Sequence, residues 1–263
     1  MSEVPDILVR ITEAVRARLA GSAPARDLEA RAWEASRRGG RRSLRAALEA
    51  PGVRVIAECK HRSPSRRWLR KEFEPVALAR AYEAGGAAAI SVVTEPEFFA
   101  GQADWVAEVR DQVALPVMQK DFLLTPRQLF EAVLLGADAV LLIARILPGP
   151  VLSELLALAG ELGLEALVEV HDGEDLERAL ATPAPLVGIN ARDLRTFRVD
   201  LEAAVELASR VPHDRAVVLE SGIGGPAELA ALARRGIRRF LIGEHLVRSP
   251  DPRAALTELV SWA

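Results

Sequence analysis

Residues 53–60 read VRVIAECK, and the rest of the chain repeats the pattern that this stretch begins. An almost continuous apolar run is typical of a strand buried on both faces. Side chains two apart on a strand share a face, so Glu58 and Lys60 point the same way. Cys59 points the other way, toward the surrounding helices, as a small hydrophobe. An acid and a base aimed at the interior where the strand ends indicate chemistry at that end.

Seven similar runs follow, and amphipathic helical stretches separate them. The eight expected strands are 53–58, 87–93, 116–121, 138–144, 164–170, 184–190, 215–220 and 238–243. Several of the helical stretches end in glycine just before the next strand, as helices often do. Eight strand–helix units predict an α/β fold, a (β/α)8 TIM barrel over residues 53–263. A doubly wound open sheet is the main alternative, but its glycine-rich fingerprint is absent after the first strand.

Residues 1–52 precede the repeat and are expected to form three helices, over 5–20, 26–38 and 42–50. We interpret this segment as an N-terminal helical extension that covers the barrel within a single domain. Its basic run RRGGRR, at 37–42, is typical of a solvated turn between helices, with an anion contact as the alternative.

Composition narrows the class of protein. The net charge of −3 gives no general attraction for nucleic acid or an anionic membrane. One cysteine cannot form an internal disulfide, the N-terminus lacks a signal-peptide core, and no apolar run is long enough to cross a membrane. We therefore expect a soluble cytoplasmic protein, a monomer, that acts on a small molecule and has no nucleic-acid or membrane partner.

Polar residues mark the carboxyl ends of the expected strands, where barrel enzymes carry their chemistry. These strand ends carry Glu58, Lys60, Lys120, Asp121, Glu169, Asn190, Arg192, Glu220, Ser221 and Gly243. Only three of the 34 basic residues are lysines, and two of those three are at strand ends, as is the single asparagine. Arginine stays protonated, whereas lysine can be tuned into an acid or a base, so this placement predicts proton transfer.

Glu169, in LVEVHD (167–172), lies at the end of an apolar strand. Desolvation is therefore expected to raise its pKa, which is typical of a general base.

Two loops predict a phosphate site. ESGIGGP (220–226) and FLIGEHL (240–246) follow the seventh and eighth strands, where barrels of this kind commonly bind phosphate at helix N-termini. The expected contacts come from Ser221, Gly222, Gly243 and the backbone N–H of Glu244, because the Glu244 carboxylate would repel phosphate. The four histidines share no metal-ligand spacing and are expected in polar loops, so no metal or other cofactor is predicted.

Several motifs together resemble the indole-3-glycerol phosphate synthase family. AECKHRSPS matches its E-x-K and S-P-S signature. The likeness continues in order through QKDF (119–122), ADAVLLIARIL (137–147), LVEVHD (167–172), GINARDL (188–194), ESGI (220–223) and FLIGEHLVRSP (240–250). The resemblance implies a lyase of tryptophan biosynthesis. Its substrate would be 1-(2-carboxyphenylamino)-1-deoxyribulose 5-phosphate, and its products indole-3-glycerol phosphate, carbon dioxide and water.

The resemblance also implies roles for residues. Lys120 looks like the general acid of ring closure. Glu58, Lys60 and Glu169 share the loss of the hydroxyl, with Glu169 as proton acceptor; which lysine serves which step stays open. The resemblance implies further contacts with the substrate. Asn190 would contact the hydroxyl or the carboxylate, and Ser63 and Arg192 the carboxylate. Phe122, Leu141 and Leu194 would surround the ring, Glu220 would contact the substrate, and Lys60 would also contact the phosphate. Residues 63–75 are a candidate lid, on which Trp68 is either part of the closure or a loop anchor.

Three alternatives remain open from sequence. A Schiff-base aldolase on the same barrel would tend to carry lysine where this chain has Asn190. A sugar-phosphate isomerase acting on phosphoribosylanthranilate would use a cysteine on the first strand, but Cys59 points away. A non-catalytic barrel that binds phosphate ligands would not need Lys60, Lys120 and Glu169 together.

Overall fold

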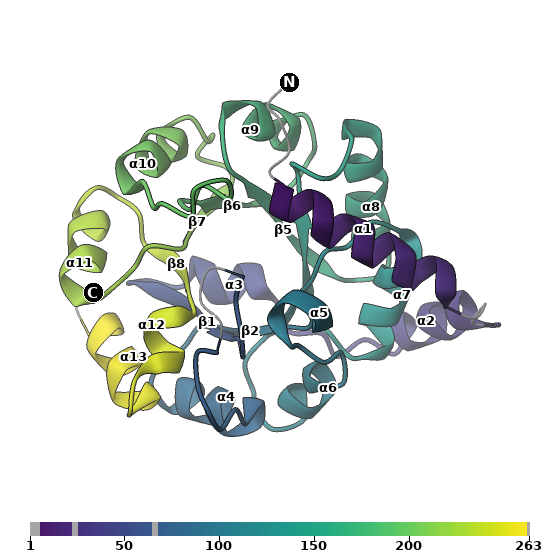
Figure 1. Ribbon diagram of the computed structural model, residues 1–263, viewed down its shortest axis with the longest axis horizontal. Coiled ribbons are helices and arrows are strands. Elements are labelled where there is room, and N and C mark those ends of the chain that lie inside the picture. The colour runs from purple at the N-terminus through teal and green to yellow at the C-terminus, as the bar shows by residue number, and fades with distance from the viewer. Residues whose placement is uncertain (1–5, 23–25, 65–67, 262–263) are drawn as a thin grey trace.

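Eight parallel strands close into a barrel in the computed structural model, which describes residues 6–22, 26–64 and 68–261 (Figure 1). Each strand pairs with the next along the chain, and β8 pairs with β1. The strands are β1 Arg54–Cys59, β2 Ala89–Val93, β3 Val117–Lys120, β4 Ala139–Ile143, β5 Glu165–Val170, β6 Leu186–Asn190, β7 Ala216–Glu220 and β8 Arg239–Ile242. The predicted barrel is confirmed, and every predicted strand end lies within two residues of the observed one.

Helices surround the barrel (Figure 1). They are α4 Pro75–Ala84, α5 Pro96–Phe99, α6 Trp105–Arg110, α7 Pro126–Leu134, α8 Gly149–Glu161, α9 Gly173–Leu180, α10 Leu201–Ser209, α11 Pro226–Arg234, α12 Glu244–Arg248 and α13 Pro252–Val260. Many of these helices begin with proline at the first turn or with an aspartate that accepts a backbone N–H, as Asp172 does from Asp175. Because strands and helices alternate, the apolar strand residues are covered on both sides, and Cys59 faces α4 as predicted, with Sγ 3.7 Å from the Pro75 carbonyl oxygen.

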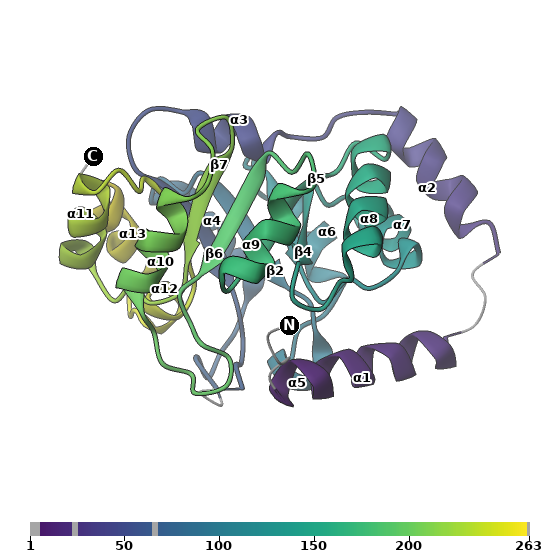
Figure 2. The same ribbon diagram turned by 90° about the horizontal axis from the view of Figure 1, so that it is seen from above.

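The N-terminal segment forms three helices close to the predicted positions: α1 Asp6–Gly21, α2 Leu28–Arg37 and α3 Leu44–Glu49. Figure 2 shows α1 and α3 at opposite ends of the barrel, with α2 beside α7 on the outside. On α1, Leu8 and Ile11 are buried, and Arg18 forms an ion pair with Glu95 at 3.4 Å. Among the described residues, no helix is both long and apolar enough to cross a membrane.

The basic run 37–42 was expected to be a solvated turn, but its last residue, Arg42, contacts the barrel. The Arg42 backbone N–H donates to Asp138 Oδ1 at 2.9 Å, and its guanidinium donates to the Leu115 carbonyl at 2.8 Å. Asp138 is fully buried and also accepts from Arg110 at 3.0 and 3.2 Å and from the Val117 N–H at 2.9 Å. The run therefore attaches the extension to the barrel through a buried carboxylate whose oxygens accept from several donors.

We expect Asp138→Asn to lower the free energy of unfolding by about 2–4 kcal/mol, because it leaves the Arg110 guanidinium without its ionic partner. Urea unfolding followed by circular dichroism measures the effect. Asp111→Asn, at an exposed position after α6, is the matched control and should change the free energy by less than about 0.5 kcal/mol. Equal effects of the two substitutions would contradict this role of Asp138.

Candidate active site

A cavity of about 990 Å³ opens at the carboxyl ends of the strands. Every residue that the sequence analysis assigned to catalysis, substrate or phosphate contributes to its wall. These are Glu58, Lys60, Ser63, Lys120, Phe122, Leu141, Glu169, Asn190, Arg192, Leu194, Glu220, Ser221, Gly222, Gly243 and Glu244. Their convergence follows from the parallel barrel, which brings all eight strand ends to one mouth. The individual roles stay predictions.

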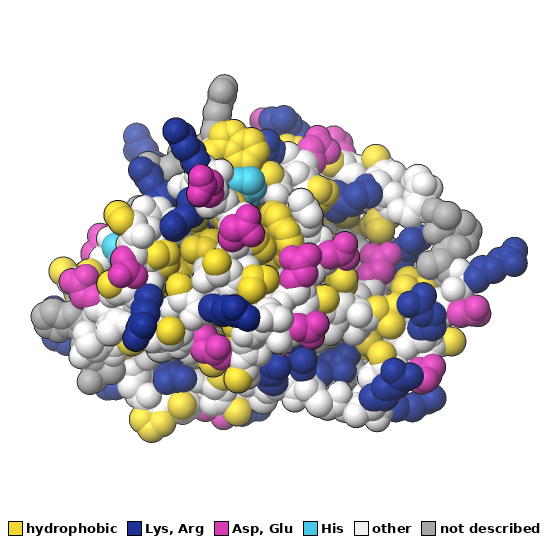
Figure 3. Space-filling model, turned by 90° about the horizontal axis from the view of Figure 1, so that it is seen from below, with side chains coloured by type: hydrophobic (Ala, Val, Ile, Leu, Met, Phe, Trp, Pro, Cys, Tyr) yellow, Lys and Arg dark blue, Asp and Glu magenta, His cyan; other side chains and the backbone are white. Residues whose placement is uncertain are grey.

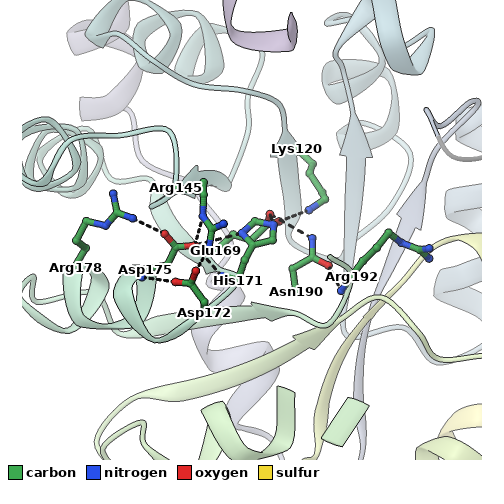
Figure 4. A network of polar contacts seen from close by, with 9 residues as sticks. All are labelled: Lys120, Arg145, Glu169, His171, Asp172, Asp175, Arg178, Asn190 and Arg192. Atoms are coloured by element: carbon green, nitrogen blue, oxygen red, sulfur yellow. Dashed lines mark hydrogen bonds and ion pairs between the residues drawn. The ribbon is translucent and has the colours of Figure 1, made fainter. Parts of the chain in front are cut away.

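Lys120, at the end of β3, is shared by two acids across the barrel. Its Nζ lies 3.1 Å from Oε2 of Glu169 on β5 and 2.9 Å from Oε2 of Glu220 on β7. Asn190, at the end of β6, donates from Nδ2 to Oε1 of Glu169 at 3.4 Å. Figure 4 shows Lys120 and Asn190 both directed at the Glu169 carboxylate. Both acids are almost fully buried, and Lys120 provides positive charge that favours an ionised carboxylate beside it.

Glu58 and Lys60 project together, as their spacing on β1 predicted. Oε1 of Glu58 lies 2.5 Å from Nζ of Lys60. Two glycines leave room for the acids: a Cβ at Gly243 would collide with the Glu58 carboxylate, and one at Gly188 would collide with that of Glu220. Glycine at these two positions therefore leaves space that the carboxylates occupy, and a larger side chain would displace them.

The pKa of Glu169 is opposite to the expected one. Burial by itself raises this pKa, but the Lys120 ammonium, followed by His171 and the hydrogen bond from Asn190, lowers it to about 2. Burial raises the pKa of Glu220 to about 8, against the opposing effect of Lys120 and with a further rise from the charge of Glu169. Burial opposes the charge on Lys120, yet Glu169, Glu220 and Glu58 raise its pKa well above the ordinary value. Near neutral pH the site therefore holds a charged lysine, an ionised Glu169 and a protonated Glu220.

The loops after β7 and β8 line the cavity with Ser221, Gly222, Gly243 and Glu244. Ser221 and Gly222 have consecutive positive φ angles of 66° and 83°, which turn the chain sharply after β7. Gly225 precedes α11, and Gly243 precedes α12, whose first residue is Glu244. Free N–H groups at helix N-termini favour an anion.

The apolar part of the wall is larger than the sequence indicated. Besides Phe122, Leu141 and Leu194, it includes Phe99 after β2 and three side chains of α1, namely Ile7, Leu8 and Ile11. The rings of Phe99 and Phe122 lie 6.0 Å apart. An aromatic pair in the motif TEPEFF, in a chain with only 5% aromatic residues, was the available signal for Phe99.

The predicted lid is only partly described, because residues 65–67 lie outside the described residues. Trp68 is 59% exposed and packs against His61, with ring centroids 4.7 Å apart. The structure leaves both interpretations of Trp68 as predictions.

On the loop after β6, Arg192 donates from Nη1 to the Phe197 carbonyl at 3.1 Å.

The histidines form no metal site in the described ranges, where no cluster of three His, Cys, Asp or Glu side chains could hold an ion. The expectation that all four lie in polar loops is wrong for His245, which lies in α12. His171 lies in the loop after β5 but is buried there. Its side chain is 7% exposed, and Nε2 lies 3.2 Å from Oε1 of Glu169. The motif LVEVHD places it two residues after Glu169, which was the signal that the strand-end analysis did not use.

We compare the free energy of unfolding of the parent protein with that of Glu220→Gln. The difference, parent minus variant, is expected to fall as pH rises from about 5 to above 8. The folded pKa of Glu220, about 8, lies above its unfolded value of 4.5, so the folded state binds the extra proton in this window. The stability that this proton confers is lost as pH rises through the folded pKa. Urea unfolding at a series of pH values measures the difference. The exposed control Glu206→Gln should give a flat difference, and a flat difference for Glu220→Gln would refute the assignment.

Comparison with known proteins identifies the family of this chain. The sequence model of the indole-3-glycerol phosphate synthase family matches residues 7–259. An indole-3-glycerol phosphate synthase of Rhodopirellula baltica is 46% identical over 262 residues, covering 99% of this chain and 100% of that protein. One from an Acidovorax species is 41% identical over 263 residues and covers 98% of each chain.

Solved structures show the same architecture at low identity. The crystal structure of a 3-hexulose-6-phosphate synthase has a TM-score of 0.64 at 16% identity, covering 80% of this chain and 99% of that one. A thiamine phosphate pyrophosphorylase from Pyrococcus furiosus gives 0.61 at 19% identity, covering 84% and 97%. These likenesses concern the fold alone. From the family match over nearly the whole length and the two full-length relatives, the chain belongs to the indole-3-glycerol phosphate synthase family.

Proposed function

We propose that this protein is an indole-3-glycerol phosphate synthase, a carboxy-lyase of tryptophan biosynthesis. It closes the ring of 1-(2-carboxyphenylamino)-1-deoxyribulose 5-phosphate with loss of carbon dioxide and water. The observation that carries the proposal is the charged Lys120 held between Glu169 and Glu220 in a cavity. Its wall has an apolar part and also includes the glycine-containing loops after β7 and β8. Such a cavity suits a molecule with an aromatic ring and a phosphate.

The acid and base roles follow from the charges in the site. Lys120 is a protonated donor, and we propose that it protonates the carbonyl oxygen as the aromatic carbon attacks. Glu169 is ionised, and we propose that it accepts a proton as the ring becomes aromatic. Its low pKa in the free protein reflects the neighbouring Lys120 charge. When Lys120 gives up its proton, that stabilising charge disappears, so Glu169 becomes a stronger base at the step that needs one.

The other groups are proposed to bind and orient the substrate. Glu58 holds Lys60 in place, by an ion pair, for contact with the substrate or its phosphate. Asn190 holds the hydroxyl or carboxylate, and Ser63 and Arg192 hold the carboxylate. The remaining proposed contacts are Phe122, Leu141 and Leu194 to the ring, Glu220 to the substrate, and Ser221, Gly222, Gly243 and Glu244 to the phosphate.

Features of the whole molecule support three further proposals. Residues 1–52 and 53–263 are proposed to fold as one domain, because α1, α2 and α3 pack on the barrel and Arg42 binds the buried Asp138.

A monomer is proposed because the exposed large hydrophobic side chains of the described ranges, Val9, Trp68 and Val199, lie on separate elements. On the face in Figure 3, charged and hydrophobic side chains are interspersed. A cytoplasmic location is proposed because a biosynthetic enzyme of this family acts on a small molecule.

The proposed activity is tested by incubating the purified protein with the carboxyphenylamino sugar phosphate, with no metal or cofactor added. Formation of indole-3-glycerol phosphate, followed by indole absorbance or fluorescence, supports the proposal. Saturable binding without turnover would instead support a binding protein. Borohydride trapping of a keto-sugar phosphate on a lysine would support an aldolase.

We expect Lys120→Ala to lower kcat by at least about a hundredfold, the usual scale for a general acid. Lys120→Arg should recover little of the loss, because arginine keeps the charge between the two acids but does not readily release a proton. Arg31→Lys, at an exposed position of α2 away from the cavity, is the control and should leave kcat unchanged. Near-parent turnover of Lys120→Arg would show that Lys120 acts by charge alone.

A further inference from the structure

His171 is a buried group next to the site that the proposed reaction does not use. It follows β5 directly, and Figure 4 shows its ring between Glu169 and Asp175. Nε2 lies 3.2 Å from Oε1 of Glu169, and Nδ1 lies 3.6 Å from Oδ2 of Asp175. His171 lines a second cavity, of about 400 Å³, whose wall does not include Glu169. It therefore approaches Glu169 from the side of the second cavity and not from the side of the first.

Asp175, at the other side of the ring, is held firmly. It is fully buried near the start of α9, and Arg145 approaches Oδ2 with Nε at 2.8 Å and Nη2 at 2.7 Å. Arg178 donates to Oδ1 at 2.6 Å, and the His171 backbone N–H donates to Oδ2 at 3.0 Å. Because Asp175 has two arginine partners, its carboxylate stays ionised and fixed, and it gives the imidazole a rigid neighbour.

The ring thus has one carboxylate at each nitrogen. A neutral imidazole can donate to one of them, and a ring protonated on both nitrogens can donate to both. On Glu169, Oε1 faces His171 and Asn190, while Oε2 faces Lys120 at 3.1 Å. Lys120 and Asn190 hold the carboxylate by hydrogen bonds. The His171 ring closes a further side at ion-pair distance, and neither of its nitrogens has a hydrogen-bond partner elsewhere among the described residues.

We propose that His171 is a positioning residue for Glu169, which it orients through Nε2 while Asp175 fixes the ring from the other side. The proposal rests on the proposed function, since it concerns the base of that reaction. His171 acts through Glu169, so its loss should slow turnover more than it weakens substrate binding. A role limited to filling space would lower kcat only as far as it lowers stability, whereas positioning depends on a donor at the place of Nε2.

Two substitutions of similar polarity separate these roles. In His171→Gln the side-chain amide can reach the position of Nε2 beside Glu169, whereas the shorter side chain of His171→Asn reaches only the position of Nδ1 beside Asp175. We expect His171→Asn to lower kcat by about tenfold or more, with KM within about threefold of the parent. We expect His171→Gln to keep kcat within about threefold of the parent. His213→Gln, in an exposed loop before β7, is the control and should leave both constants unchanged.

Steady-state kinetics and urea unfolding of the four proteins decide the matter. Equal kcat values for His171→Asn and His171→Gln, whether both high or both low, would overturn the proposal. So would a loss of kcat that follows the unfolding midpoint across the variants. An inactive parent protein would overturn the proposed function and this inference with it, whereas an active parent with equivalent variants overturns the inference alone.

Discussion

One ammonium group shared by two buried carboxylates is the interaction on which the site depends. Burying an isolated carboxylate costs several kcal/mol, and one nearby cation can offset that cost for one acid more readily than for two. Lys120 therefore leaves Glu169 ionised and Glu220 protonated, with pKa values of about 2 and about 8. Two chemically identical side chains acquire different protonation states because their surroundings differ, and this is the condition for acid–base chemistry at one pH.

The barrel supplies the geometry for this arrangement. Lys120, Glu169 and Glu220 end β3, β5 and β7, and side chains from alternate strands meet in one layer of such a barrel. β6 lies between the two acidic strands and carries Gly188 where a larger side chain would displace Glu220. Around this polar centre, α1 and the segment after β2 add apolar wall. The extension therefore contributes to the cavity at one end of the barrel while Asp138 fastens it at the other.

Much of this could be predicted from the chain alone. Apolar runs ending in polar residues determined the eight strands, since only burial on both faces explains them. The scarcity of lysine singled out Lys60 and Lys120, and the two-residue spacing on β1 correctly placed Glu58 beside Lys60 and turned Cys59 outward. These inferences depend only on local periodicity and composition, which a sequence displays directly.

The errors share one physical reason, which is that they concern neighbours distant in sequence. The pKa of Glu169 was predicted from burial alone, but its direction is decided by Lys120, 49 residues away. Arg42 was assigned to a solvated turn because its partner, Asp138, is 96 residues further on. His171 was expected to be an ordinary loop residue because the sequence does not show that the carboxylates of Glu169 and Asp175 both turn toward its ring. Likewise, periodicity makes α1 amphipathic without revealing that its apolar side borders the cavity.

The charge on Lys120 is the feature that can be measured most directly. The chain has only three lysines, so protein labelled with ¹⁵N at lysine Nζ should give few signals, and Lys120→Arg identifies the one from Lys120. The account predicts that this signal keeps the chemical shift of a charged ammonium up to about pH 11, because two carboxylates contact it. A Lys120 signal that titrates at or below the ordinary lysine value of about 10.4 would contradict the shared ion pair on which the proposed chemistry rests.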